Sequence, residues 1–258
     1  VLYGIKILVE NSSYPSNPIG FPTFSPPELI MNATRVALDR GIVQYTRAQG
    51  HVRLVNALKS YLQPSLGFEV DAMKNIVVSV GATEALLLAT LAILNEGDEC
   101  LLIQPFYDSY VEQVRLAGAR PIFASLRRGA GDASSWSLPF DEMSALVRQS
   151  KRVKLMFLNN PANVPGKVYT RAELQQVAAF AIEHNLIVVS DEVYDVLTFE
   201  PHRYPMIRLA SLPGMAERVV TIGSAGKLFS TTGFKIGWAV GPTDIITAMA
   251  RVHQYVPF

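Results

Sequence analysis

The chain has 258 residues, of which 49% are hydrophobic and 17% charged, a balance that predicts one large globular domain with a substantial core. The formal net charge of +1 gives no electrostatic reason to expect nucleic acid or an acidic membrane surface as a partner. A single cysteine, Cys100, excludes an internal disulfide and a multi-cysteine metal site. No apolar run reaches membrane-spanning length. We expect a cytoplasmic protein, and a mitochondrial location is also compatible with the sequence.

Predicted helices and strands alternate along most of the chain. Residues 1–27 are rich in Pro, Asn and Ser without a sustained period, and they predict an extended arm. The pair Pro26-Pro27 then lies near the first turn of a helix that is predicted to end at about Leu38. Further helices are predicted over 54–62, 83–94, 110–117, 141–149 and 171–184 and close to the C-terminus, and strands over 76–80, 100–103, 121–124, 153–158, 186–190 and 219–222.

Short, β-branched apolar runs between amphipathic helices indicate an α/β fold. The runs are apolar on both faces, which is typical of a mostly parallel sheet flanked by helices. Ligands of such sheets bind at the carboxyl ends of the strands. The predicted strand ends place five candidate residues there: Gly81, Pro105, Asn159, Asp191 and Gly223.

Two lysines lie in residues 224–238, a segment rich in small residues that follows the apolar run 219–222. Little side-chain bulk surrounds Lys227, so its amine can approach a bound cofactor closely and condense with an aldehyde to a Schiff base. Lys235, eight positions later (235 − 227 = 8), can meet a phosphate. A surface lysine is the alternative, which the small and apolar neighbours of Lys227 disfavour. Lys227 is therefore the predicted covalent anchor of pyridoxal 5′-phosphate (PLP).

Three polar residues after predicted strands fit the same cofactor. A carboxylate at a buried strand end, Asp191, can hold the protonated pyridine nitrogen that makes the ring an electron sink. Tyr194, three residues on, can bond the 3′-oxygen of the cofactor, and Asn163 can reach the same oxygen. The alternatives are a capping aspartate, a half-buried tyrosine and a turn asparagine.

Two further features are compatible with a cofactor role as well as with an ordinary structural role. Gly81, Ala82 and Thr83 lead from a strand into a helix, whose free N–H groups can bind phosphate, although a tight turn is the commoner explanation. The ring of Tyr107 can stack on a cofactor, or it can be a core aromatic. The chain has no GxGxxG or Walker pattern, which argues against a nicotinamide-binding domain.

Together these segments resemble the fold-type I, PLP-dependent aminotransferases of class I and II. Within that group the sequence is similar to the kynurenine aminotransferases, also called glutamine transaminase K or cysteine-S-conjugate β-lyases. The matching blocks cover nearly the whole chain in the family's order: Gly20-Phe21-Pro22, Gln44-Tyr45-Thr46-Arg47, and residues 81–85, 105–110, 160–167, 190–194 and 224–238.

The resemblance implies a role for each candidate. Lys227 would be the Schiff-base lysine, Asp191 the partner of the pyridinium, and Tyr194 a third catalytic group. Asn163 would join Tyr194 at the 3′-oxygen, and Tyr107 would stack on the ring. The residues implied around the phosphate are Gly81, Ala82, Thr83, Ser224 and Lys235.

The resemblance also implies partners and a domain division. The tyrosine that matches Tyr45 reaches the cofactor of a neighbouring subunit in the family, so a homodimer is expected. Gly20 is expected near the substrate, together with Tyr107 and Asn163. Residues 1–27 would form the N-terminal arm and 28–258 a PLP-transferase-like large domain. The family's C-terminal small domain, with its substrate-binding arginine, is expected to be absent.

Two departures from the family pattern lie near the expected substrate site. Val164 stands where the family has a second proline in its Asn-Pro-x-Asn-Pro-x-Gly block, and Pro165 follows it. Thr23 replaces the common aspartate after Gly20-Phe21-Pro22. Both changes are expected to alter loop conformation and substrate fit.

The implied activity is transamination between an aromatic or sulfur-containing L-amino acid and a 2-oxo acid, with β-lyase activity on cysteine S-conjugates as an extension. One alternative is another class I/II aminotransferase, of the methionine or alanine type, because the motifs are shared across the group. A second is a fragment that binds PLP without turnover, because no arginine here takes the carboxylate-binding role.

Overall fold

The computed structural model describes residues 24–129 and 135–257. Among these residues, seven strands form one sheet in the order β1-β9-β8-β7-β6-β2-β3, and β4 pairs with β5 in a separate two-stranded ribbon. Strand β9 runs antiparallel to both of its neighbours, whereas the pairs from β8 through β7, β6 and β2 to β3 are parallel. The strands are β1 (Ile76–Val80), β2 (Glu99–Gln104), β3 (Arg120–Ser125), β4 (Arg127–Arg128), β5 (Trp136–Ser137), β6 (Val153–Asn159), β7 (Ile187–Asp191), β8 (Val219–Ser224) and β9 (Ile236–Val240).

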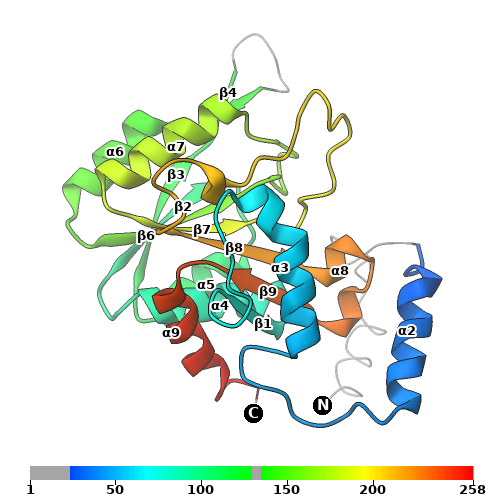
Figure 1. Cartoon of the computed structure of the whole chain (residues 1–258). Helices are drawn as coiled ribbons and strands as arrows, with labels where there is room; N and C mark the ends of the chain where they lie inside the picture. The colour runs from blue at the N-terminus through cyan, green and yellow to red at the C-terminus, as the bar shows by residue number, and fades with distance from the viewer. Residues whose placement is uncertain (1–23, 130–134, 258) are drawn as a thin grey trace, which may run out of the picture.

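Helices cover both faces of the sheet (Figure 1). Helices α3, α6 and α7 pack on one face and α4, α5 and α9 on the other, so each face has its own cluster of buried apolar side chains. Burial of one such side chain stabilises the fold by roughly 1.5–3 kcal/mol. The helices are α2 (Glu28–Asp39), α3 (Val52–Leu66), α4 (Gly81–Ile93), α5 (Ser109–Leu116), α6 (Phe140–Gln149), α7 (Arg171–Glu183), α8 (Ala225–Leu228) and α9 (Thr243–His253), with 3-10 turns η1 (Leu209–Ser211) and η2 (Thr232–Phe234).

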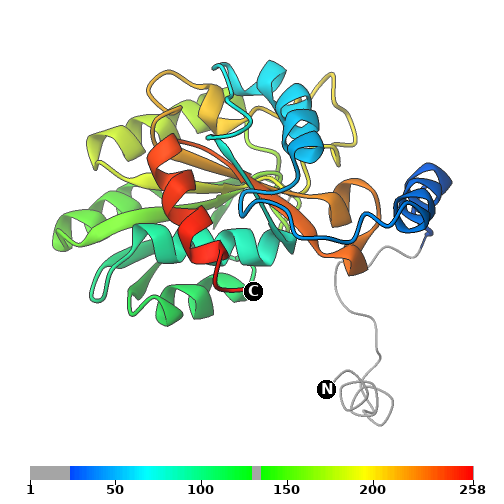
Figure 2. The same cartoon turned by 60° about the horizontal axis from the view of Figure 1, so that its bottom comes forward.

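Helix α2 differs from the other long helices because it stands clear of the sheet and its covering helices (Figure 2). None of its residues is buried. Leu29 and Leu38 expose 78% and 63% of their surface. This helix therefore adds no side chain to the two core clusters, and Leu29, Val36 and Leu38 are exposed apolar side chains on it.

The mostly parallel α/β architecture predicted from the sequence is confirmed, and so are the predicted helices and strands, within a few residues at their ends. Helix α4 begins at Gly81 itself, whose φ of 76° turns the chain directly from β1 into the helix. The predicted arm over residues 1–27 lies largely outside the described residues. No described helix is long and apolar enough to cross a membrane.

Three strands were not predicted from the sequence: the two-residue strands β4 and β5, and β9 in the main sheet. Residues 236–240 were treated only as part of the lysine-containing motif, yet they form β9 between β1 and β8. The strand is five residues long and contains Gly237, so its own pattern gives a weak signal. It pairs with the preceding strand β8 on one side and with β1 on the other, and β1 is distant in sequence, so no local pattern encodes that pairing.

Candidate active site

The candidate site residues gather where β6, β7 and β8 end. Asn159 and Asp191 are the last residues of β6 and β7 and lie opposite each other in the parallel register. Ser224 ends β8, and the chain passes directly into the one-turn helix α8, which holds Lys227. The carboxyl ends of three adjacent parallel strands thus form one edge. Asn159 and Asp191 lie at strand ends as predicted, whereas β8 continues through Gly223 to Ser224.

Asp191 is a buried carboxyl group with defined hydrogen-bond donors. Asp191 as a whole residue is only 4% exposed. The hydroxyl of Tyr110 donates to Oδ2 over 2.5 Å, and the backbone N–H of Val193 donates to Oδ1 over 3.3 Å. Burial raises the pKa of the carboxyl above its ordinary value, while these hydrogen bonds and the nearby Lys227 lower it. A cation placed beside Asp191 would favour its ionised form.

Tyr194 and Asn163 are hydrogen-bonded to each other. The Nδ2 of Asn163 donates to the Tyr194 hydroxyl over 3.1 Å, which occupies a lone pair of the hydroxyl and not its proton. The backbone N–H of Asn163 in turn donates to Oδ1 of Asn159 over 2.7 Å. Burial and then the charge of Asp191 raise the pKa of Tyr194, so its hydroxyl stays protonated and able to donate.

Lys227 lies over the ring of Tyr194, with its Nζ 5.7 Å from the ring centroid. Burial lowers the pKa of its amine below the ordinary value. The carboxylate of Asp191 opposes this change, and Lys235 adds to it. A lowered pKa gives a larger fraction of neutral amine, which is the nucleophilic form.

A second cation lies at the beginning of α4. A Cβ placed on Gly81 would come within 3.4 Å of the Lys235 Nζ, so the ammonium lies against the first residue of the helix. The first N–H groups of a helix have no intrahelical acceptor, and the helix dipole is positive there. Ammonium and helix terminus together favour an anion at this point.

Glycine at position 237 makes this close arrangement possible. A Cβ there would lie 2.4 Å from the backbone N of Ala82 and the backbone C of Gly81. Gly237 pairs with Ser79 on one side and with Ser224 on the other, so three strands meet the start of α4. We call the residues around it the anion site: Gly81, Ala82, Thr83, Ser224 and Lys235.

The remaining sequence candidates fall in three different places. Tyr107 packs edge to face on Tyr110, with ring centroids 5.7 Å apart, and is 44% exposed. Tyr45 is 88% exposed on the segment that follows α2. Gly20 lies outside the described residues.

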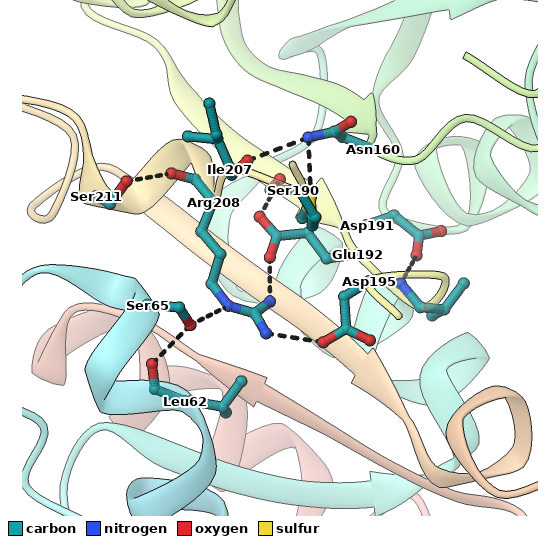
Figure 3. Close-up of polar contacts among 12 residues, drawn as sticks. Leu62, Ser65, Asn160, Ser190, Asp191, Glu192, Asp195, Ile207, Arg208 and Ser211 are labelled. Atoms are coloured by element: carbon teal, nitrogen blue, oxygen red, sulfur yellow. Dashed lines mark hydrogen bonds and ion pairs between the residues drawn. The ribbon is translucent and has the colours of Figure 1, made fainter. Parts of the chain in front are cut away.

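The sequence analysis missed Tyr110 as a site residue. Its signal was weak, since it stood only at the end of the matched block 105–110, and its partner Asp191 is 81 positions away. A buried charge cluster next to Tyr194 in the chain was also not predicted; in it Arg208 contacts Glu192 and Asp195 (Figure 3).

The arrangement fits PLP by the chemistry of its donors. A partly neutral amine suits an aldehyde, a buried carboxyl suits the pyridine nitrogen, and the anion site suits the phosphate. With this site at the strand ends of a mostly parallel sheet, fold and site define an α/β protein of the aminotransferase type. A family model for aminotransferases of class I and II matches residues 18–258, and the chain belongs to that family.

Two relatives and one solved structure match this chain over most of its length. The chain is 45% identical over 252 residues to a kynurenine–oxoglutarate transaminase of Dictyostelium discoideum, covering 93% of this chain and 57% of that protein. It is 41% identical to the human kynurenine–oxoglutarate transaminase 1, with 91% and 57% covered. The solved structure of N-succinyldiaminopimelate aminotransferase from Mycobacterium tuberculosis matches with a TM-score of 0.85 and 37% identity, over 92% of this chain and 60% of that one. The chain therefore spans somewhat more than half the length of these relatives.

Proposed function

We propose that this chain is the PLP-binding part of an aminotransferase that moves the amino group of a kynurenine-type L-amino acid to a 2-oxo acid. The observation that carries the proposal is the placement of Lys227 over Tyr194 and near the buried Asp191, at the strand ends. The substrate class rests on relatives named kynurenine–oxoglutarate transaminases, at 41% to 45% identity.

Each polar residue of the site has a distinct task in this proposal. Lys227 would hold PLP covalently, and its Nζ would afterwards accept the Cα proton of the amino acid and return it. Asp191 would face the pyridine nitrogen and keep it protonated. Tyr194 would donate its free proton to the 3′-oxygen, supported by Asn163. The anion site would bind the phosphate. Bound PLP supplies an electron sink for the charge that develops at the substrate Cα.

We also propose a homodimer. Tyr45 is strongly exposed, so its implied cofactor contact suits the site of a second copy better than that of its own chain. The outward apolar residues of α2 offer a surface that a second copy would cover.

Borohydride reduction of the PLP-loaded protein tests the cofactor proposal. Peptide mass mapping is expected to find the pyridoxyl group on Lys227. Lys227→Ala should lose the adduct and the absorbance of bound PLP, together with transamination. As a control, Lys235→Ala should weaken PLP binding through the anion site but keep the adduct on Lys227. An adduct on a different lysine, or none, would overturn the assignment.

Turnover needs its own assay, with kynurenine, methionine and alanine as donors and 2-oxoglutarate as acceptor. We expect kynurenine to give the highest kcat/KM. A preference for methionine or alanine as donor would assign the chain to another branch of the family. A stable adduct on Lys227 without turnover of any donor would favour the alternative of a PLP-binding fragment.

A further inference from the structure

Arg208 is a buried cation in the connection between β7 and β8. Only 7% of its side chain is exposed, yet each guanidinium nitrogen donates a hydrogen bond. Nη1 donates to Glu192 Oε2 over 2.5 Å and Nη2 to Asp195 Oδ2 over 2.7 Å. Nε donates to the hydroxyl of Ser65 on α3 over 2.7 Å. Figure 3 shows the guanidinium with the two carboxylates above it and to its right, and with Ser65 on its left, at Nε.

The two carboxylates belong to residues that flank Tyr194. Glu192 comes two positions before it and Asp195 directly after it. The backbone N–H of Asp195 donates to the carbonyl of Glu192 over 3.1 Å, so this stretch is a tight turn. Arg208 therefore fixes both ends of the turn that presents Tyr194 to Asn163 and Lys227.

Helix α3 completes the cluster. The hydroxyl of Tyr61 donates to Asp195 Oδ2 over 2.8 Å, and the Ser65 hydroxyl donates to the carbonyl of Leu62 over 2.9 Å. The other oxygen of Glu192, Oε1, accepts from Ser190 over 2.9 Å. We call Tyr61, Ser65, Glu192, Asp195 and Arg208 the Arg208 cluster.

Geometry makes arginine hard to replace here. Its planar guanidinium donates in three directions from three nitrogens, whereas a lysine donates from a single atom. Two carboxylates face one cation, so the loss of Arg208 would leave like charges together in a buried place. Burial already raises the pKa of Glu192, and the nearby Arg208 lowers it again. Without Arg208, we expect either the turn to rearrange or one of the two carboxylates to take up a proton.

We propose that Arg208 is a positioning residue, which holds the Tyr194 hydroxyl at the place where it meets the 3′-oxygen of PLP. This inference rests on the proposed function, because only bound PLP provides the 3′-oxygen that Tyr194 would meet. Arg208 acts only through the turn and through α3 and touches neither substrate nor cofactor.

Arg208→Gln tests the proposal, with Arg203→Gln as the matched control. Arg203 lies in the same connection, is exposed, and pairs with Glu200 at 3.5 Å on the surface. The first readout needs no cofactor. Amide hydrogen exchange of the apo protein is expected to speed up by about tenfold in the peptide that holds 192–195 in Arg208→Gln, which is about 1.4 kcal/mol of lost protection. The Arg203 variant should not change it.

The second readout is the pH midpoint of the absorbance change of bound PLP. A tyrosine that donates well makes the 3′-oxygen less basic, so a misplaced Tyr194 should move the midpoint to higher pH. We expect Arg208→Gln to raise it by about one pH unit, and Arg208→Lys to restore only part of the difference. Tyr194→Phe should raise it too, and Arg208→Gln added to Tyr194→Phe should then have no further effect.

The outcomes separate this proposal from the proposed function. If the wild type shows no PLP absorbance, the cofactor assignment fails. If the wild type binds PLP and Arg208→Gln leaves the midpoint unchanged, or shifts it equally in the Tyr194→Phe background, Arg208 has only a structural role. Should Arg208→Gln not fold, Asp195→Ala removes the contact of Arg208 with the residue directly after Tyr194, and it must raise the midpoint for the proposal to stand.

Discussion

At Asp191, burial and hydrogen bonding change the pKa of one carboxyl group in opposite directions. Burial raises its pKa, and the donors Tyr110 and Val193 oppose this. Burial also raises the pKa of the Tyr110 hydroxyl well above its ordinary value, so Tyr110 stays a proton donor. The sequence indicated the carboxyl but not the hydroxyl that keeps it oriented.

Tyr110→Phe removes that donor. We expect the pKa of Asp191 to rise further, so that the acid-side fall in activity moves to higher pH and kcat decreases. Loss of a hydrogen bond to a charged group should also lower the free energy of unfolding by about 1.5–3 kcal/mol. The pH dependence of kcat and urea denaturation measure the two effects.

A second buried tyrosine provides the control for this change. Tyr169 is 2% exposed, and Tyr169→Phe removes its hydroxyl without a contact to Asp191. The control should keep the wild-type pH profile. An unchanged profile in Tyr110→Phe would mean that Tyr110 does not support Asp191 in the working enzyme.

At the scale of elements, the anion site depends on how closely three strands approach one helix. Gly237 of β9 lies against the first peptide of α4, with space for no side chain. Lys235, the residue before β9, adopts a left-handed conformation with φ of 54° and thereby turns its side chain to Gly81. Strand β9, which the sequence analysis missed, is thus the element that closes the site.

Gly237→Ala tests this arrangement. The added methyl would meet backbone atoms at 2.4 Å, and the start of α4 must shift. We expect the free energy of unfolding to fall by about 1–3 kcal/mol. The affinity for inorganic phosphate and for PLP should fall as well, because the N–H groups of the anion site move. Urea denaturation and isothermal titration calorimetry measure these quantities.

Gly233→Ala is the control within the same segment. A Cβ on Gly233 would have no atom within 4 Å. This variant should match the wild type in stability and in phosphate affinity. Equal behaviour of the two variants would show that the contact between β9 and α4 does not shape the anion site.

At the scale of the whole molecule, every long described helix except α2 contributes buried side chains to one of the two apolar clusters. This helix carries exposed leucines and leads to the exposed Tyr45. Both observations are explained if a second copy covers this part of the surface, as the proposed homodimer requires.

Leu38→Glu tests the homodimer. A charge on the apolar side of α2 should weaken self-association by about tenfold or more, or roughly 1.4 kcal/mol, as measured by sedimentation equilibrium. Asn32→Glu adds the same charge at an exposed polar position of the same helix and should leave the dimer nearly intact. A wild-type monomer at all concentrations would contradict the proposal, and equal effects of the two variants would place the interface elsewhere.

The sequence by itself determined the α/β class and the segments of most strands and helices, because apolar periodicity and turn residues are local signals. It also indicated Lys227 and Asp191, because each follows an apolar run within a distinctive block. Only the tertiary structure decided which strands adjoin, and with them the place of β9, the donor Tyr110 on Asp191, and the link from Arg208 to α3. These features depend on residues brought together from distant parts of the chain, as with Arg208 and Ser65, which are 143 positions apart, and packing selects such pairs without leaving a local pattern.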